Sequence, residues 1–528
     1  MAMNEYSKIP TSKFRFVNEG ERITDKKFDD KPIGYFRDAL RRFCKSRASV
    51  IAFFIIVAIV LFSLITPLLS TMETTFMDPY YQKMGPRNLT LRDIGIMTGT
   101  VNRDVREQAL MLQLAVGVGA EHYQFGEYNP NYTLEESLTS YYQPIREIGD
   151  DETVLQHGKE TRLFTDTAID TYLEVGFIYK SVTQQEYQKI LDWQNETNLQ
   201  ILYPLIENNE YTPDATNANY WYKMDNRFNP LKTDDMGNAT KMSYKPGLKL
   251  EDNYKRNEDG SLKIFEYTGG GSLETAQYRV RILYYNYYRY VNGFEPEHIF
   301  GTDTAGYDMA LRVANGLKLS LLLAVVVSAI NFVLGAMFGA VEGYYGGWID
   351  LFMERVSDVL MGVPGIVVQT LFQIHLAAKV GPIVSMIFAF VLTGWISIAY
   401  RVRAQFYRFK NQEYVMAART LGARDRRIIW KHIFPNTLGT LITSVALIIP
   451  GVIFTESMLS YLGIVNLGSA TQTSLGTLLN AASQSKWTEY PHVLLVPAIF
   501  ISLLMISFNL FGNGLRDAFN PSLRGVEE

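Results

Sequence analysis

The stretch that decides the fold is residues 319–341, LSLLLAVVVSAINFVLGAMFGAV, which contain no Asp, Glu, Lys or Arg. A hydrocarbon core about 30 Å thick is crossed by about 20 helical residues, so this run is long enough to span a membrane. Five further charge-free and mostly aliphatic runs share this character, at 48–72, 359–378, 380–400, 432–455 and 490–515. The sequence therefore predicts six transmembrane helices and excludes an ordinary soluble enzyme.

The charge of the chain is divided between two parts. Its 50 Lys and Arg and 54 Asp and Glu leave a net charge of −4. Residues 72–312 hold 23 basic and 36 acidic side chains, a net charge of −13, which leaves +9 for the remainder. The basic residues flank the apolar runs, an arrangement that does not suit a nucleic-acid-binding surface. The single cysteine, Cys44, excludes a disulfide framework or a multi-cysteine metal site.

Loop charge predicts the orientation in the membrane. Residues 1–47 carry twelve Lys and Arg against seven acids and lack the apolar core of a signal peptide. The loop 401–431 carries nine basic and two acidic residues. Because short basic loops stay in the cytoplasm, we expect the tails 1–47 and 516–528 and the loop 401–435 to lie inside. The long acidic segment 73–297 is then extracytoplasmic, because it lies between the first two spans.

The outer segment 73–297 is polar and rich in tyrosine, and its pattern predicts an inserted α+β domain. Turn-forming residues over Tyr222–Tyr267 indicate hairpins or loops. Five stretches are expected to be helical: Arg103–Val116, Leu134–Tyr142, Ala168–Tyr179, Gln184–Leu202 and Leu273–Tyr290. The tyrosines between Tyr284 and Tyr290 are interpreted as packing or membrane-interface residues rather than a ligand-stacking site. A polar run, Ser457–Ser485, is expected to be a partly helical outer loop.

The sequence contains no phosphate-binding loop of the form G-x-x-x-x-G-K-[ST], no H-E-x-x-H metal motif and no G-x-S-x-G nucleophile motif. No catalytic residue, metal ligand or cofactor is therefore assigned to this chain. The predicted spans also carry no charge at their centres, which disfavours an ion-coupled carrier, since such proteins usually need an ionisable group in the membrane. We expect another polypeptide to supply the energy.

The functional hypothesis depends on the basic loop between the fourth and fifth predicted spans, which reads EYVMAARTLGARDRRIIWKHIFPN over residues 413–436. The first part is expected to be a short helix that starts at Glu413 and carries the small residues Ala417 and Ala418. Gly422 is placed to end that helix with a left-handed residue. A second, basic helix then leads to Pro435 at the entry to the next span. Small residues permit close approach of another surface, so the loop suits a rigid lever.

This loop resembles the E-A-A-x(3)-G-x(9)-I-x-L-P signature of ATP-binding-cassette (ABC) importer permeases of the oligopeptide/dipeptide/nickel family. Met416, His432 and Phe434 replace three of the signature residues, and Glu413 lies one helical turn before Met416. The resemblance implies that the loop is the coupling helix, which docks on the ATPase subunit. The residues it assigns to coupling are Glu413, Ala417, Ala418, Arg419, Gly422, Ala423 and Pro435.

The resemblance extends beyond the loop. HIFGTDTAGYD at 298–308 and FNLFGNGLRD at 508–517 are similar to segments of the C-type permease subunit. Together with weaker matches, they cover residues 36–72 and 298–524. They imply an all-α polytopic protein with the type I ABC importer permease fold, whose core at 298–515 holds five of the six spans. The insert 73–297 has no counterpart in the short members of the family.

The implied function is that of the transmembrane permease subunit of an ATP-driven importer in the bacterial cell membrane, most plausibly for oligopeptides. Its implied partners are a B-type permease subunit, two ABC ATPase subunits that bind ATP and Mg²⁺, an extracytoplasmic peptide-binding lipoprotein, the peptide and membrane lipid. Pro364, Pro450 and Pro497 are candidate gating kinks. The alternatives are a peptide-sensing receptor, or an importer of dipeptides or nickel. The insert is interpreted as a docking platform, a lid or an adhesion module.

Overall fold

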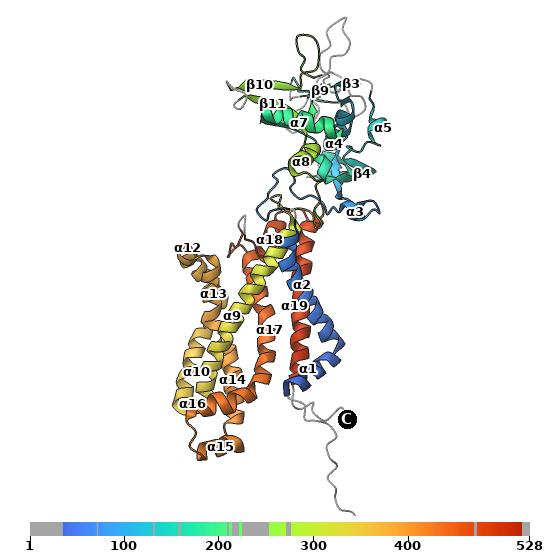
Figure 1. Ribbon diagram of the computed structural model, residues 1–528. Helices are drawn as coiled ribbons and strands as arrows, with labels where there is room; N and C mark the ends of the chain where they lie inside the picture. The colour runs from blue at the N-terminus through green and yellow to red at the C-terminus, as the bar shows by residue number, and fades with distance from the viewer. Residues whose placement is uncertain are drawn as a thin grey trace, which may run out of the picture.

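The computed structural model describes residues 35–70, 72–129, 132–156, 160–207, 211–213, 221–223, 253–270, 276–468 and 472–519. An elongated helical bundle carries a mixed domain, built from the residues described between 72 and 297, at one end (Figure 1). The short helix α15 (Glu413–Thr420) lies at the opposite end of the bundle (Figure 1). The predicted insert and the predicted coupling loop are therefore separated by the length of the bundle.

Five helical stretches among the described residues are long and apolar enough to cross a membrane. Their apolar composition explains the helices, because backbone groups in lipid must be satisfied within the helix itself. The five stretches are α2 (Arg47–Leu69), α9 (Met309–Tyr345), α13 with α14 (Pro382–Gly394 and Ile396–Phe409), α16 with η3 and α17 (Asp425–Arg427, Ile428–Ile433 and Phe434–Tyr461), and α19 (Pro491–Phe519). Four of them extend beyond the charge-free runs by four or more residues.

The prediction of one uninterrupted helix over 359–378 is wrong. This run is divided between α10 (Gly347–Met361) and α11 (Gly365–His375), and the four-residue α12 (Ala377–Val380) follows. The break falls just before Pro364, which precedes α11. Proline lacks the N–H that a continuous helix needs and disfavours helical geometry in the residue before it. Eleven residues rise only about 16 Å, so α11 alone is too short to cross a bilayer.

Helix α9 lies at the centre of the bundle and packs on α2, α14 and α17. Three glycines spaced four residues apart, Gly335, Gly339 and Gly343, face α14. A Cβ atom on Gly339 would lie 2.2 Å from the carbonyl oxygen of Ala399, so only glycine allows this approach. Small residues with this spacing let helix backbones approach closely in membranes. Two further helices complete the bundle, α1 (Tyr35–Lys45) beside α2 and α19, and α18 (Leu475–Ser483) beside α17 and α19.

The domain between α2 and α9 contains two principal antiparallel sheets. One has the order β1-β5-β4 (Thr100–Arg106, Glu160–Asp170 and Ile145–Gln156). The other has the order β10-β11-β6 (Phe265–Gly269, Gln277–Leu283 and Phe177–Thr183), and β7 (Leu202–Tyr203) also pairs with β11. Two short ribbons are β2 with β3 (Tyr123–Gln124 and Glu127–Tyr128) and β8 with β9 (Tyr211–Pro213 and Trp221–Lys223). The helices are α3 (Leu89–Arg92), α4 (Glu107–Glu121), α5 (Leu134–Ser137), α6 (Thr171–Glu174), α7 (Gln184–Thr197) and α8 (Tyr284–Asn292).

This domain combines helices and strands, as predicted, but two of its expected helices are wrong. Ala168–Tyr179 holds the end of β5, the single turn α6 and the start of β6. Leu273–Tyr290 begins with residues outside the described part and continues as β11 followed by α8. In both cases the stretch mixes apolar and polar residues at helical spacing, and pairing with neighbouring strands overrides that pattern. The helix expected at Arg103–Val116 is shifted and corresponds to α4, and the helix expected at Leu134–Tyr142 is shortened to α5. The helix expected at Gln184–Leu202 corresponds to α7.

The tyrosines of α8 are packing residues, as predicted. Tyr284, Tyr285, Tyr287 and Tyr288 are all buried in one apolar cluster with residues of β6, β11 and α7. Burial is compatible with their polar tips because several hydroxyls find partners. The hydroxyl of Tyr284 donates to Asp78 Oδ2 at 2.6 Å. Burial, together with that hydrogen bond, raises the pKa of Tyr284 far above its usual value.

The same domain is joined tightly to the start of the bundle. The backbone N–H of Asp78 donates to the carbonyl oxygen of Gly306, and a Cβ atom on Gly306 would overlap the carbonyl oxygen of Asp78. Gly306 has φ +93°, which favours glycine for a second reason. The hydroxyl of Thr302 donates to the carbonyl oxygen of Tyr81 at 2.7 Å and accepts from the N–H of Met84. The segment 298–308, which directly precedes α9, therefore holds the inserted domain against the start of the bundle.

Candidate functional site

Helix α15 ends in the left-handed turn that the sequence predicts. The N–H of Ala423 donates to the carbonyl oxygen of Ala418, and the N–H of Gly422 donates to that of Arg419, both at 3.0 Å. This pair of bonds forms a Schellman motif, which satisfies carbonyl groups at a helix end. Gly422 has φ +77°, and a Cβ atom there would contact nothing within 4 Å. The requirement for glycine is therefore conformational and not steric.

One side of α15 is anchored in the bundle. Val415 is fully buried in a cluster with Phe406 of α14 and with Ile428 and Ile433 of η3. Ala423 packs against the same cluster from the turn. Because the cluster includes residues of α9, α14 and α17, movement of α15 would displace the ends of three long helices together. Predicted site residues Ala418 and Ala423 lie at the edge of this anchor and are half-buried.

The other side of α15 projects away from the bundle. Leu421 is 88% exposed and Met416 is 50% exposed, although both side chains are apolar. Tyr414 is also exposed, and so are the predicted site residues Glu413, Ala417 and Arg419. We call the exposed residues Glu413, Tyr414, Met416, Ala417 and Leu421 the α15 face. Exposed apolar side chains gathered with small and charged residues are typical of a protein-binding surface.

Polar contacts hold α15 in place against the end of α9. The hydroxyl of Tyr344 donates to Asp425 Oδ1 at 2.6 Å and accepts from Arg419 Nη2 at 3.3 Å. Asn436 Nδ2 donates to the hydroxyl of Tyr414 at 3.1 Å, which links α15 to the start of α17. Arg419 is exposed like Glu413, but its guanidinium contacts the bundle through Tyr344.

The segment after α15 leads into α17 through a wide helical turn. Residues Ile428–Ile433 form a π-helix, and Pro435 lies at the beginning of α17. A proline in the first turn of a helix is tolerated because its missing N–H has no helical partner there. His432 and Phe434, which depart from the family signature, are half-buried, and Pro435 is exposed. The structure therefore places Pro435 at the hinge between the loop and α17 and not on the α15 face.

A second polar cluster lies nearby and was not predicted. Arg403 of α14 donates from Nε and Nη2 to the two carboxylate oxygens of Asp350 at 2.6 and 2.8 Å. The same guanidinium donates to Glu354, and Tyr407 donates its hydroxyl to Asp350 Oδ2. Although burial favours the protonated acid, these donors hold the pKa of Asp350 below its usual range. The cluster ties α10 to α14 on the side of the bundle that carries α15.

Two buried acids that were not predicted lie near the ends of α9 and α17, outside the predicted charge-free spans. Glu456 of α17 is fully buried, and its carboxylate accepts from the hydroxyls of Ser320 at 2.8 Å and Ser460 at 3.0 Å. Glu342 of α9 is also fully buried, 3.8 Å from Arg403 Nε. Both residues were missed because the predicted spans were limited to charge-free runs, whereas α9 and α17 continue past them. Both would have been found if each predicted span had been allowed to continue past a single charged residue.

The three prolines expected to act as kinks have different positions. Pro450 lies inside α17 and is buried, and Pro497 lies inside α19 and is buried. Pro364 lies between α10 and α11, so it separates two helices instead of bending one. The polar run Ser457–Ser485 was expected to be partly helical, and it contains the end of α17, a connecting turn and α18.

An apolar bundle with a projecting helix of this kind defines the chain as an integral membrane protein with a surface suited to a partner. Residues 308–525 match the family described as the binding-protein-dependent transport system inner membrane component. Residues 34–87 match the N-terminal transmembrane domain of oligopeptide transport permease C. The chain therefore belongs to this family of transport permeases, as a C-type subunit of the oligopeptide and dipeptide branch.

Two permease proteins and one solved structure are similar to parts of this chain. The chain is 39% identical to the oligopeptide transport system permease protein OppC of Bacillus subtilis over 229 residues, 43% of this chain and 73% of that protein. It is 41% identical to the dipeptide transport system permease protein DppC of the same organism, over 43% of this chain and 70% of that protein. An inward-facing MetNI methionine ABC transporter matches with a TM-score of 0.32 at 16% identity, over 39% of this chain and 97% of that one.

Proposed function

We propose that this chain is the transmembrane subunit of an ATP-driven importer of oligopeptides, and that the α15 face is where an ATPase subunit docks. The observation that carries the proposal is the combination of exposure and anchorage at α15. Leu421 and Met416 project outward, while Val415 on the same short helix is fully buried in the bundle. A surface that binds a moving partner and is fixed to three long helices can transmit force to them.

The proposed orientation places α15 in the cytoplasm and the inserted domain outside. The basic residues of the loop 401–431 support this orientation because positively charged short loops remain inside. The inserted domain and α15 lie at opposite ends of the bundle, so an orientation with α15 inside puts the inserted domain outside (Figure 1). Both termini are then cytoplasmic, since α1 and the end of α19 lie toward the α15 end (Figure 1).

The proposed assembly contains a B-type permease subunit, two ABC ATPase subunits and an extracytoplasmic peptide-binding lipoprotein. The energy comes from ATP and Mg²⁺ bound by the ATPase subunits, because this sequence contains no phosphate-binding loop. Peptide is favoured as the cargo by the names of the relatives, which are oligopeptide and dipeptide permeases.

In the proposed cycle, closure of the ATPase dimer pushes the α15 face and so shifts the bundle between inward-facing and outward-facing states. Such a shift requires that the ATPase dimer bind the two states with different affinity. Pro450 and Pro497 lie inside long helices, where a missing backbone hydrogen bond permits bending. We assign them to the helix bending that accompanies gating. The Arg403–Asp350 pair keeps α10 and α14 together during that movement.

The test is to replace Gly422 with valine in the reconstituted transporter and to measure ATP hydrolysis and uptake of a labelled oligopeptide together. A β-branched residue cannot adopt φ +77° without strain, so the turn that orients the α15 face should open. We expect uptake to fall at least about tenfold, which corresponds to about 1.4 kcal/mol of lost coupling. The ATPase subunits should remain bound and continue to hydrolyse ATP.

The matched control is Gly365→Ala. Gly365 also has open space around a built Cβ atom, but its φ is not in the left-handed region. Uptake by this variant should equal that of the wild type. Normal uptake by the Gly422→Val protein would contradict the proposal, and so would oligopeptide binding by the assembled complex with no ATP-dependent accumulation, which is the behaviour of a sensing receptor.

A further inference from the structure

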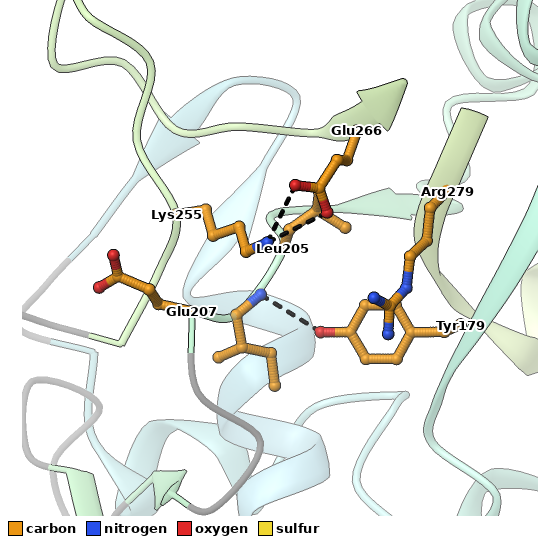
Figure 2. Close-up of a pocket in the computed structure, with 7 residues that line it drawn as sticks. Tyr179, Leu205, Glu207, Lys255, Glu266 and Arg279 are labelled. Atoms are coloured by element: carbon orange, nitrogen blue, oxygen red, sulfur yellow. Dashed lines mark hydrogen bonds and ion pairs between the residues drawn. The ribbon is translucent and has the colours of Figure 1, made fainter. Parts of the chain in front are cut away.

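A small polar pocket of about 260 Å³ lies in the inserted domain, far from α15. Its lining comes from β6, β10 and β11 and from the two chain segments around residues 206 and 255. Figure 2 shows Arg279 and Tyr179 on one side of the pocket and Glu207 on the other, with Lys255 and Glu266 between them. The lining therefore contains two cations and two carboxylates.

Arg279 has a free guanidinium in spite of a carboxylate directly across the sheet. Glu266 on β10 pairs in register with Arg279 on β11. The carboxylate of Glu266 nevertheless turns to Lys255, whose ammonium donates to both of its oxygens at 3.0 and 3.2 Å. This hydrogen bond with Lys255 lowers the pKa of Glu266, so the carboxylate is charged at neutral pH. Within the part of the chain that the structure describes, no carboxylate forms an ion pair with Arg279.

The guanidinium of Arg279 is held in position by stacking. Its central carbon lies 4.6 Å from the centre of the Tyr179 ring. Stacking on an aromatic face leaves the in-plane N–H groups of arginine available, and their fork matches the two oxygens of a carboxylate. The Tyr179 oxygen accepts from the N–H of Ile206 at 3.3 Å, and its own O–H remains a possible second donor to the same ligand.

Glu207 supplies the opposite charge. Its backbone N–H donates to the carbonyl oxygen of Asn253, which fixes the residue at the rim. Its side chain is exposed and forms no ion pair with any residue among those described. Figure 2 places its carboxylate on the far side of the Lys255–Glu266 pair from Arg279. With respect to the described residues, the pocket therefore presents a cation without an ion-pair partner at one end and an anion without one at the other.

We propose that this pocket binds a very short peptide whose free carboxylate and free ammonium group lie at its two ends. The carboxylate binds Arg279 and the hydroxyl of Tyr179, and the ammonium group binds Glu207. The formal charge of the lining is zero, because Lys255 and Arg279 balance Glu207 and Glu266. A phosphate or another multiply charged anion would meet two carboxylates there, whereas a zwitterion is attracted at both ends.

The size of the pocket limits the ligand to a very short peptide, and a single amino acid is excluded because both of its charged groups lie on one carbon. Pockets for drug-sized molecules are about 300–1,000 Å³, and this one is slightly smaller. Free alanine carries the same two charged groups without the separation, so its binding tests whether the two ends are used together. The site is independent of α15, and its binding does not require the coupling proposed above.

The test is isothermal titration of the purified full-length protein in lipid nanodiscs with alanine, dialanine, dialanine amide and N-acetyl-dialanine. We expect dialanine to bind, and we expect alanine, the amide and the acetylated analogue of the peptide to bind at least about tenfold more weakly. Arg279→Gln should abolish the preference for a free carboxylate, and Glu207→Gln should abolish the preference for a free ammonium group. Lys189→Gln, an exposed change on α7 of the same domain, should leave both preferences intact.

Two results would overturn the proposal: failure of dialanine to bind at millimolar concentration, or binding that neither Arg279→Gln nor Glu207→Gln weakens. Tighter binding of inorganic phosphate than of dialanine would overturn it as well. The Gly422→Val protein is included because its binding should equal that of the wild type. Loss of uptake with retained binding in that variant separates the coupling proposal from this one.

Discussion

Arg103 of β1 donates from Nη1 to the hydroxyl of Tyr490 at 2.8 Å, a hydrogen bond between residues 387 positions apart in the chain. The same guanidinium also pairs with Glu174 of the inserted domain and lies 5.5 Å from the centre of the Tyr490 ring. Tyr490 directly precedes α19. The inserted domain is thus connected to the last long helix as well as to the start of α9.

This contact predicts that Arg103→Gln loosens the inserted domain without unfolding the bundle. A hydrogen bond to a charged group contributes about 1.5–3 kcal/mol, and its loss should raise the local opening rate. Hydrogen exchange should therefore accelerate in β1 and around residues 486–493. Tyr490→Phe, which keeps the ring and removes only the hydroxyl, should have a smaller effect. Equal exchange in Arg103→Gln and the wild type would mean that the contact does not hold the domain.

The seat of the inserted domain gives a matched pair of glycine variants. Gly306 and Gly260 both have left-handed φ values, +93° and +81°, but only Gly306 faces a neighbouring backbone atom. Alanine at either position has the same conformational strain, about 1 kcal/mol. Gly306→Ala should in addition push Asp78 away and lower the melting temperature much more than Gly260→Ala. Equal melting temperatures would show that the contact between Gly306 and Asp78 is not tight in solution.

The buried carboxylate of Glu456 gives a prediction about hydroxyl partners in the membrane. Ser320→Ala removes one of its hydrogen bonds across two helices, and the cost should be about 1.5–3 kcal/mol because the acceptor is a buried acid. Ser483→Ala removes a hydroxyl that is exposed on α18 and bonds only its own helix, so its cost should be near zero. Thermal unfolding in detergent measures both. Equal stability of the two variants would argue against a buried carboxylate network.

The pair between Asp350 and Arg403 predicts a loss of stability in acid. Burial opposes the charge of Asp350, but the hydrogen bonds from Arg403 and Tyr407 outweigh it and lower its pKa. A carboxyl whose pKa is lower in the folded state stabilises the fold above its unfolded pKa of about 4 and loses that effect as the pH falls through the folded value. Melting temperature should therefore fall in this acidic window, and it should fall less in Asp350→Asn.

The control for this experiment is Asp93→Asn, because the Asp93 side chain is largely exposed. Its pH response should match that of the wild type. If Asp350→Asn also follows the wild-type curve below pH 4, the ion pair does not contribute to acid sensitivity.

Much of the bundle could be predicted from the sequence because lipid imposes one strong rule. An apolar run such as 319–341 must be helical, and it lies inside α9. Gly422 could also be predicted, because few residues other than glycine adopt the left-handed turn that ends α15. The exposure of Leu421 and Met416 could not be predicted, because apolar residues in a short helix usually face the core.

The remaining failures have identifiable causes. The break before Pro364 was missed because hydropathy ignores backbone hydrogen bonding. The strand β11 was missed in part because one of its partners, β6, lies far away in the sequence. The pocket around Arg279 was missed for the same reason, since Tyr179, Glu207 and Arg279 come from three separate segments. Sequence spacing carries no signal for such a site.

The most direct test of the account is a crosslink from position 421. A Leu421→Cys protein in a Cys44→Ser background has one thiol on the α15 face, because Cys44 is the single cysteine of the sequence. We predict that a thiol–amine crosslinker joins it to the ATPase subunit in the assembled complex, and that the yield changes with ATP. Leu68→Cys, at a position that is 82% exposed at the other end of the bundle, should not crosslink. Labelling of position 421 from outside intact cells, without a crosslink to the ATPase, would contradict the account.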